Sequence, residues 1–439
     1  MKESTSFSDL IRFTSRPLDH DHLAIGAEYH FRNAGGIYLY TNNHSQIMDF
    51  SVGLTGHNLG YNHPKVMAAV ACQMERYARS GGFFDNSQTI FKLKNSLAGN
   101  LPSGLDSFFF TNTEAEAMKY ALWLAHVITN RPVVIRISTS PFGQTMGSTM
   151  MSHLTELEGL DEDDDPGLIT FQLMLRNSTR EAAEIAPVTF LSELLSRLQD
   201  LVISYGTLAQ VSAIIVELGG EHNGFVPPPP HVLPAVQSLC DQYGIMFILD
   251  EGRAAIGRTG SMFASQAFKV DPDLTVFGRG IANDFPLGCV VIKHGLVAGL
   301  LEGQWNTTEI DPISCAAALA TLGVIDDEDL LCNCLRMGAR LRTGLQVLQN
   351  RFPMIGAVRG VGLNCSLEIV STEDPSLPCA SSARTLVNNL LDHGLLVYSA
   401  GAHGNILCLM PPLNVTEDQV DCALNILEQC LENREAYPI

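Results

Sequence analysis

Strand-length apolar runs alternate with amphipathic helical segments through the middle of this 439-residue chain, and that alternation constrains the fold more than any other feature. Segments 66–79 and 232–243 have apolar residues at i, i+3, i+4 and i+7, and each reaches a glycine within two residues of its end, which indicates helices. Strands separated by crossover helices form a largely parallel sheet covered on both faces, so we predict an α/β fold. The apolar runs are VVIRI (133–137), AIIV (213–216), MFIL (246–249) and CVVI (289–292).

The chain is long enough to expect more than one domain, since a single hydrophobic core rarely serves more than about 300 residues. Residues 326–352 have the pattern of a long amphipathic helix, and short strands and a last helix over 417–432 follow it. The first 55 residues also look strand-rich. We therefore predict a large α/β domain over 56–324 and a smaller α/β domain built from 1–55 and 325–439.

The charge balance argues against several classes of partner. With 27 basic and 47 acidic residues the net charge is −20, and the basic residues are scattered singly. We therefore expect neither nucleic-acid binding nor attachment to a membrane. The densest acidic run, DEDDD at 161–165, is followed at once by Pro166 and Gly167, which indicates a solvated loop, and we assign no metal site.

Cysteine usage and the first residues favour a cytoplasmic protein. Eleven cysteines at irregular spacing match neither a disulfide framework nor the paired ligands of zinc sites, which favours a reducing compartment. The N-terminal segment lacks the apolar core of a signal peptide. No stretch reaches the roughly 18 apolar residues that a membrane helix needs.

Three segments carry a specific resemblance to a known family. The central one is ILDEGRAAIGRTGSMFASQAFKVDPDLTVFGRGIANDFPLGCVV at 248–291. The others are GYNHPKVMAAV at 60–70 and DPISCAAAL at 311–319, which MPPL follows at 410–413. In this order they resemble the class III aminotransferases, the group that includes ornithine and 4-aminobutyrate aminotransferases. The resemblance implies the fold-type I architecture of pyridoxal-phosphate (PLP) enzymes, whose large domain has a mostly parallel sheet of the seven-stranded type.

The resemblance also implies a set of site residues. A PLP site of this kind needs an acid at the pyridine nitrogen, a lysine for the Schiff base, phosphate-binding amides at a helix N-terminus and an aromatic ring against the cofactor. Asp250 stands where the family has its pyridinium partner. Glu217, in VELGG, stands where the family has the acid of its Glu-Pro motif.

The lysine of the family is replaced by Arg279, in the turn that follows the Pro-Asp step. Arginine stays protonated near neutral pH and cannot act as the nucleophile of a Schiff base. Lys269 and Lys293 would each need a large change of register to take its place. We therefore do not expect an ordinary transaminase.

The cofactor-binding positions depart from the family as well. Its Ser-Gly-Ser/Thr at a helix start aligns with Thr113, Glu114 and Ala115, so a carboxylate replaces the glycine and a hydroxyl is lost. A carboxylate about 5 Å from a phosphate costs roughly 3 kcal/mol per unit of phosphate charge at an effective dielectric constant near 20. Phe142 is one residue away from the position of the stacking aromatic, so the ring has been shifted or lost, and Thr307 matches the threonine that reaches the partner subunit's phosphate. We therefore expect no cofactor, with PLP only as a weak non-covalent ligand.

Two arginines and two acids are expected in the same cavity, as candidates for catalysis. Buried carboxylates need cationic partners, so we predict that Arg279 lies within ion-pair distance of Asp250 or Glu217, with Arg253 nearby. The alternative is that these pairs are only structural. His222, in GGEHN, is a further acid/base candidate because imidazole titrates near neutral pH; the alternative is an exposed loop histidine.

Three functions remain open. The first is a repurposed enzyme that uses the cofactor cavity without PLP, for acid/base or electrostatic catalysis of a lyase, isomerase or cyclase reaction. The second is a catalytically silent pseudoenzyme that binds or regulates a partner. The third is an aminotransferase-like enzyme with non-covalent PLP or pyridoxamine phosphate. In the family the cavity is completed across a two-fold axis, so we expect a homodimer with a small-molecule ligand in the interface cavity.

Overall fold

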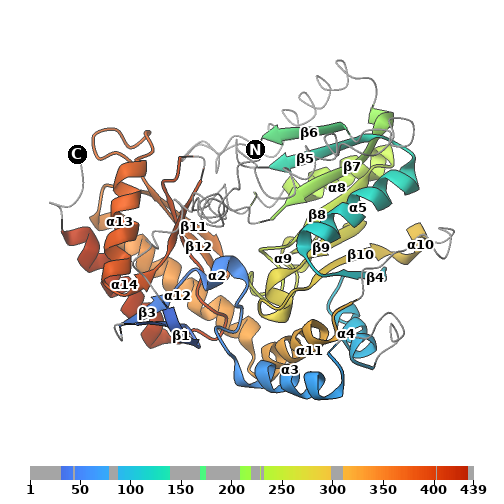
Figure 1. Ribbon diagram of the computed structural model, residues 1–439. Coiled ribbons are helices and arrows are strands. Elements are labelled where there is room, and N and C mark those ends of the chain that lie inside the picture. Colours follow the sequence, from blue (N-terminus) through green and yellow to red (C-terminus); the bar gives the residue numbers. More distant parts are fainter. Residues whose placement is uncertain are drawn as a thin grey trace, which may run out of the picture.

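The computed structural model describes residues 31–42, 45–78, 88–138, 169–174, 208–218, 228, 232–297, 310–401 and 403–433. These residues form three sheets and the helices that cover them (Figure 1). The largest sheet has seven strands, and the two smaller sheets have four strands each. The predicted α/β class is confirmed.

The seven-stranded sheet has the order β4-β10-β9-β8-β7-β5-β6. Strands β5 to β9 pair in parallel, whereas β10 is antiparallel to both of its neighbours. The run CVVI is therefore the reversed strand of a mostly parallel sheet. The strands are β4 (Leu105–Thr111), β5 (Val133–Ser138), β6 (Ile169–Met174), β7 (Val211–Glu217), β8 (Met246–Asp250), β9 (Leu274–Phe277) and β10 (Gly288–Lys293).

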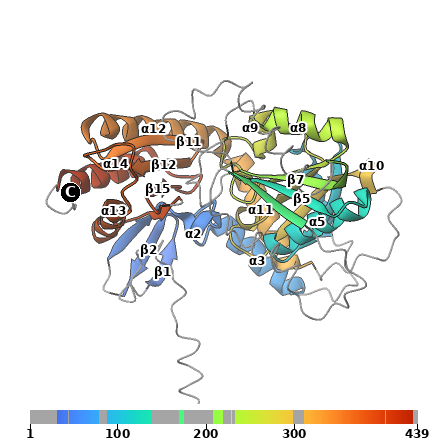
Figure 2. The same cartoon turned by 90° about the horizontal axis from the view of Figure 1, so that it is seen from above.

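Helices cover both faces of this sheet, because successive side chains of its buried strands point to opposite sides. In β7, Ala213 and Ile215 belong to the core beneath α5 (Glu114–Thr129). Ile214 and Val216 belong to the core beneath α8 (Val232–Tyr243). Figure 2 shows the two helices on opposite sides of the sheet. With both faces buried, a ligand site in this sheet is expected at the ends of its strands.

Three more helices pack together: α3 (Pro64–Arg76), α4 (Gln88–Ala98) and α11 (Pro312–Asp327), of which α11 contacts both others. The segment expected as one helix over 326–352 is divided. The helix α11 ends at Asp327, and α12 (Leu330–Arg351) begins after Asp329, whose φ of 49° is left-handed and cannot continue a helix. The shorter elements are α2 (Val52–Thr55), η1 (Leu208–Gln210), α9 (Ala264–Phe268), η3 (Arg279–Ala282) and α10 (His294–Val297).

Strands from both ends of the chain share one sheet, of order β1-β2-β3-β13, in which β3 and β13 pair in parallel. The other small sheet has the order β11-β12-β15-β14. This pairing supports our proposal that 1–55 and 325–439 form one smaller domain beside a large domain of 56–324. The elements are β1 (Phe31–Gly35), β2 (Tyr38–Thr41), β3 (Gln46–Asp49), β11 (Ile355–Val361), β12 (Asn364–Ile369), α13 (Ala380–Asp392), β13 (Leu395–Leu396), β14 (Tyr398–Ala400), β15 (Ile406–Leu409) and α14 (Glu417–Glu432).

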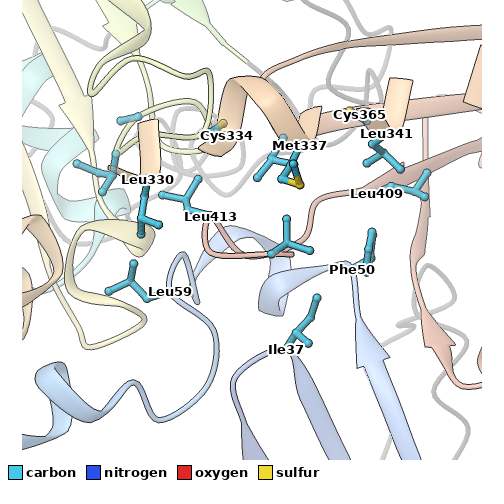
Figure 3. Close-up of a cluster of buried hydrophobic side chains, with 14 of the residues drawn as sticks. Ile37, Phe50, Leu59, Leu330, Cys334, Met337, Leu341, Cys365, Leu409 and Leu413 are labelled. Atoms are coloured by element: carbon cyan, nitrogen blue, oxygen red, sulfur yellow. The ribbon is translucent and has the colours of Figure 1, made fainter. Parts of the chain in front are cut away.

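One apolar core connects the N-terminal and C-terminal segments (Figure 3). Ile37 and Phe50 come from the first residues of the described chain, whereas Met337, Leu341 and Leu409 come from α12 and β15. All five side chains are buried. Each such side chain contributes about 1.5 to 3 kcal/mol when it is removed from water, so this core holds the two ends of the chain together.

Arg258 joins the loop after β8 to the C-terminal segment. Its side chain is 1 % exposed, and its Nη1 and Nη2 donate to the carbonyls of Pro411 and Leu363 at 2.6 and 2.8 Å. Its Nε donates to Oδ1 of Asn364 at 3.2 Å. Burial lowers the pKa of Arg258 to about 10, so the guanidinium is still charged at neutral pH.

All eleven cysteines lie in the described residues and are free. Cys289 is fully buried in β10, and burial raises the pKa of its thiol, as expected of a small core residue. Within the described part of the chain, no helix has both the length and the apolar character needed to cross a membrane.

Candidate active site

The candidate site lies at the carboxyl ends of β7 and β8, where open parallel sheets bind ligands. Glu217 ends β7, Asp250 ends β8, and the two are register partners. Arg136, in the neighbouring β5, donates from Nη2 to Glu217. The two side chains of this ion pair are only 4 % and 10 % exposed. A single charge within the apolar run VVIRI is the signal in the sequence that points to Arg136.

Asp250 is held differently from Glu217. Its Oδ1 accepts a hydrogen bond from the backbone N–H of Gly252 at 3.2 Å. Burial, and then the charges of Glu114 and Glu217, raise the pKa of Asp250 to about 8, against the opposing effects of Arg136 and the Gly252 N–H. Asp250 is therefore mainly protonated at pH 7, and it holds a proton that a basic nitrogen beside it would accept.

Glu114, the first residue of α5, projects over the ends of β8 and β9. A Cβ on Gly252 would overlap Oε1 of Glu114, and a Cβ on Gly278 would lie 2.8 Å from the Cβ of Glu114. Glycine at both positions therefore provides the space that Glu114 occupies. Oε2 of Glu114 lies 3.9 Å from Nε of Arg279. Burial raises the pKa of Glu114, while the charges of Arg279 and Arg253 act in the opposite direction.

Arg279 opens the short turn η3, directly after β9. Its φ of 38° lies in the left-handed region, which costs a residue with a side chain on the order of 1 to 2 kcal/mol. The turn is braced by Asn283, which accepts from the N–H of Leu59 at 2.8 Å and donates to the carbonyl of Gly60 at 3.0 Å. These contacts hold the turn against the N-terminal segment.

The ion pair that the structure shows for Arg279 differs from the predicted one. We predicted a pair with Asp250 or Glu217, whereas the carboxylate at 3.9 Å from Arg279 is Glu114. Glu217 is bound by Arg136 instead. The reason is geometric: β5 places a cation directly beside the end of β7, and the start of α5 lies over the turn after β9.

Lys269 and Lys293, the lysines on either side of Arg279 in the sequence, both lie away from the site. Lys269 is the C-cap of α9, on the chain that leads into the amino end of β9. Lys293 is the last residue of the reversed strand β10, so it lies at the amino ends of the parallel strands. It forms ion pairs with Asp271 and Asp273 at 3.3 and 3.2 Å. The site lies at the carboxyl end of β9 and the amino end of β10, away from both lysines.

A narrow crevice is lined by Asn58, Gly252, Arg253, Ile256, Gly278 and Gly280, among others, and two of these glycines also adjoin Glu114. Arg253 is 8 % exposed. Its positive charge acts on Glu114 and lowers the pKa of that carboxyl, against the effect of burial. The turn glycines allow the chain to approach closely, because a Cβ on Gly280 would overlap the side chain of Asn58.

The N-terminus of α5 has the features of an anion site. Thr113 is the N-cap, and its Oγ1 accepts from the N–H of Glu116 at 3.1 Å. Oγ1 of Thr111 in turn donates to the carbonyl of Thr113 at 2.7 Å. The amides of Glu114 and Ala115 belong to the first turn, so they have no acceptor within the helix and suit an anion. Ala115 has no hydroxyl to add to its amide.

Three predicted site residues lie outside the described residues: His222, Phe142 and Thr307. They stay predictions. Cys408, which stands where the family commonly has an arginine for a substrate carboxylate, is fully buried in an apolar cluster with Tyr398 and Met410. A buried thiol in apolar surroundings cannot take the place of that arginine.

The pocket fits PLP in its chemistry. Asp250 carries a proton where the family binds the pyridine nitrogen, and the first amides of α5 suit a phosphate. Glu114 was expected to repel that phosphate, but that expectation treated its carboxylate as an isolated charge. Arg279 at 3.9 Å and the nearby charge of Arg253 act against that repulsion.

Comparison with known proteins agrees with this architecture. The family profile of aminotransferase class-III matches residues 24–431. The 5-aminovalerate aminotransferase DavT of Pseudomonas putida is 30% identical over 387 residues, which cover 88% of this chain and 89% of that protein. The alanine/serine racemase of Pyrococcus horikoshii is 28% identical over 390 residues, 88% of this chain and 82% of the racemase.

A solved structure with the same fold also belongs to an aminotransferase. The taurine:2-oxoglutarate aminotransferase of Bifidobacterium kashiwanohense, in complex with PLP and glutamate, has a TM-score of 0.81 and 26% sequence identity to this chain, and 93% of each chain is covered. The expectation of no cofactor, or of PLP only as a weak ligand, is therefore wrong, because the relatives and the matching structures are PLP enzymes. The profile covers nearly all of the sequence, the fold is shared along its length, and this chain belongs to the class III aminotransferase family.

Proposed function

We propose that this protein binds PLP without a covalent lysine link and catalyses proton transfer on an amino-acid substrate, as an isomerase or a lyase, rather than transamination. The observation that carries the proposal is Arg279, which opens the turn after β9 and pairs with Glu114 at 3.9 Å. A guanidinium stays protonated and is not a nucleophile, so this turn offers no group for a Schiff base.

Each residue of the pocket then has a task. Bound PLP supplies an electron sink for negative charge on the substrate. Asp250 holds a proton for the ring nitrogen, and the negative charge of Glu217 helps to keep that proton on Asp250. Thr113 caps α5, whose first amides are available to the phosphate. Arg279 and Arg253 supply positive charge where negative charge develops on the substrate.

The names of two relatives support the proposed substrate class. DavT is named for 5-aminovalerate, and the racemase is named for alanine and serine. Racemisation moves a proton at the carbon that bears the amino group and leaves the nitrogen in place. The racemase therefore supports proton transfer without amino transfer as a chemistry available to this family.

We also propose a cytoplasmic homodimer in which Thr307 reaches the partner's pocket. The proposal of the cytoplasm rests on eleven cysteines at irregular spacing. The proposal of the dimer rests on the family's shared cavity, together with exposed apolar side chains on α3 and α4, among them Met74 and Phe91.

The test separates cofactor binding from catalysis. The protein is mixed with one equivalent of PLP, passed through a desalting column, reduced with borohydride and mapped by peptide mass spectrometry. We expect PLP to remain with the protein through the column and no single lysine to carry a pyridoxyl group. A pyridoxyl group on one lysine in high yield would refute the absence of a covalent link.

The loaded protein is then incubated in D2O with L-alanine, 4-aminobutyrate or 5-aminovalerate as probes. We expect the proton on the amino-bearing carbon of at least one probe to exchange, as loss of its proton NMR signal. Formation of glutamate from 2-oxoglutarate at a comparable rate would identify a transaminase. Retained PLP without exchange of any probe would favour the pseudoenzyme.

A further inference from the structure

Glu114 and Asp250 both lie against Gly252. The N–H of Gly252 donates to Oδ1 of Asp250 at 3.2 Å, and the space beside its Cα is filled by Oε1 of Glu114. The two carboxyls come from different elements, α5 and β8, and their charges influence each other, since Glu114 raises the pKa of Asp250. They form a carboxyl pair in the wall of the pocket.

The pair is built into its surroundings. Any side chain on Gly252 or on Gly278 would clash with Glu114. A Cβ on Gly288 would likewise overlap the carbonyl of Thr113, which caps the helix that carries Glu114. Glycine residues at the ends of β8 and β9 and at the start of β10 thus make room for the start of α5 and for the Glu114 carboxylate.

The two carboxyls have different charged neighbours, and the pKa of each is raised by burial. The pKa of Asp250 is raised to about 8, so Asp250 holds the proton. Burial raises the pKa of Glu114 as well, and two cations, Arg279 at 3.9 Å and Arg253, act in the opposite direction. A carboxyl whose pKa is raised toward the working pH is suited to take up a proton and return it.

The other charged groups of the described pocket are not suited to accept a proton. Arg136, Arg253 and Arg279 stay protonated. Glu217 is bound by Arg136 and largely buried. By contrast, Oε2 of Glu114 accepts no hydrogen bond from a described residue, and its ion pair is long.

We propose that Glu114 is the proton-accepting catalytic residue of this site, acting on the C–H bond of the carbon that bears the amino nitrogen of a small amino acid. This inference rests on the proposed function. The Glu114 carboxylate takes the proton and becomes a carboxylic acid, while the electron pair of the broken C–H bond stays with the bound substrate. The new O–H bond then breaks as the proton returns to carbon, so no oxidant or reductant is needed.

Glu114 supplies the proton acceptor that Arg279, in the turn after β9, cannot supply. Arg279 cannot carry a proton to and from a substrate at neutral pH, because it does not deprotonate. Glu114 packs against Gly278, which precedes the turn, and its carboxylate lies 3.9 Å from Arg279. The arginine is thus a positioning residue for the base.

The first arm of the test compares Glu114→Gln with Glu116→Gln. Glu116 lies in the same first turn of α5, and its Oε2 accepts from the N–H of Asn112 at 3.0 Å, an interaction that glutamine retains. In the D2O exchange of L-alanine, 4-aminobutyrate and 5-aminovalerate, Glu114→Gln should slow exchange about 10²- to 10⁴-fold, the usual contribution of a general base. Glu116→Gln should exchange at the wild-type rate.

The second arm needs neither cofactor nor activity. Carbon-13 NMR of the carboxyl groups, assigned through Asp250→Asn, follows the titration of Asp250 in the free protein. Because the charge of Glu114 raises the pKa of Asp250, Glu114→Gln should lower that pKa, whereas Glu116→Gln should leave it in place. An unchanged pKa in Glu114→Gln would show that the carboxyl pair does not exist.

The possible outcomes distinguish the role of Glu114 from the proposed proton-transfer function. Exchange by the wild type that persists in Glu114→Gln would overturn the role of Glu114 and leave the proposed function standing. Absence of exchange in the wild type, with PLP bound, would overturn the proposed proton-transfer function and the role of Glu114 with it, even if the pKa of Asp250 shifts. Loss of exchange together with the shift in pKa is the result we expect.

Discussion

Arg136 and Glu217 form a buried ion pair between β5 and β7, two neighbouring parallel strands. Replacement of Arg136 by Met should destabilise the protein by about 3 to 5 kcal/mol, because it leaves a buried carboxylate without its cation. Arg136→Met/Glu217→Met should recover most of that loss. The free energy of unfolding, determined in urea, measures the loss in the single variant and the recovery in the double variant. Arg340→Ala, which breaks an exposed pair with Asp421, is the control and should cost less than about 1 kcal/mol.

Arg258 is the second buried arginine whose loss should weaken the fold. Its guanidinium donates to two carbonyls and to Asn364, so Arg258→Met leaves these acceptors without donors. We expect a loss on the order of 3 kcal/mol in the free energy of unfolding. Arg336→Met removes an exposed arginine that contacts Asn333 at 3.2 Å, and it should have little effect. Equal stability of both variants would show that the Arg258 contacts do not join the two parts of the chain.

Asp250 should make stability depend on pH. Its pKa rises from 3.8 in the unfolded chain to about 8 in the folded protein, so between these values the folded state binds more protons than the unfolded state. The free energy of unfolding should therefore fall as pH rises through this window. Asp250→Asn should remove this contribution.

The measurement is the difference in the free energy of unfolding between wild type and Asp250→Asn at several pH values from about 5 to about 8. Burial lowers the pKa of His57, which acts in the opposite direction, but His57 is present in both proteins and its effect cancels in the difference. A difference that does not change with pH would mean that Asp250 is ionised throughout.

Arg279→Lys should not restore a covalent link to PLP at neutral pH. The carboxylate of Glu114, which lies 3.9 Å from the guanidinium, would favour the ammonium form of the new lysine and so suppress its nucleophilicity. Arg279→Lys/Glu114→Gly removes that carboxylate and should gain a pyridoxyl group on residue 279 after borohydride reduction. Peptide mass spectrometry distinguishes the two variants, and labelling of the single variant to the same extent would contradict the effect of Glu114.

The protein should be a homodimer in solution. Met74 on α3 and Phe91 on α4 are 58 % and 63 % exposed, and both helices pack on α11. Light scattering should give twice the chain mass of 47.7 kDa at micromolar concentration. The charge-introducing variant Phe91→Asp should shift the population toward the single-chain mass, whereas Leu377→Asp, on an exposed residue remote in sequence, should not.

The sequence by itself determined the fold class and the bounds of two amphipathic helices. The helices Val232–Tyr243 and Glu417–Glu432 have the bounds predicted from apolar spacing, because that periodicity is a local property of a chain whose one face is buried. The order of the motifs also led to the family, and with it to Asp250 and Glu217 at adjacent strand ends. These conclusions depend on residues near one another in the chain.

Only the tertiary structure decided which charges meet. Glu217 pairs with Arg136, which is 81 residues away in the sequence, and Arg279 pairs with Glu114. The expectation that no cofactor binds was overturned by the relatives and the matching structures, which are PLP enzymes. The energy of an ion pair depends on the distance between two atoms and on their burial. Both are set by how strands and helices assemble, which the spacing of residues along the chain does not specify.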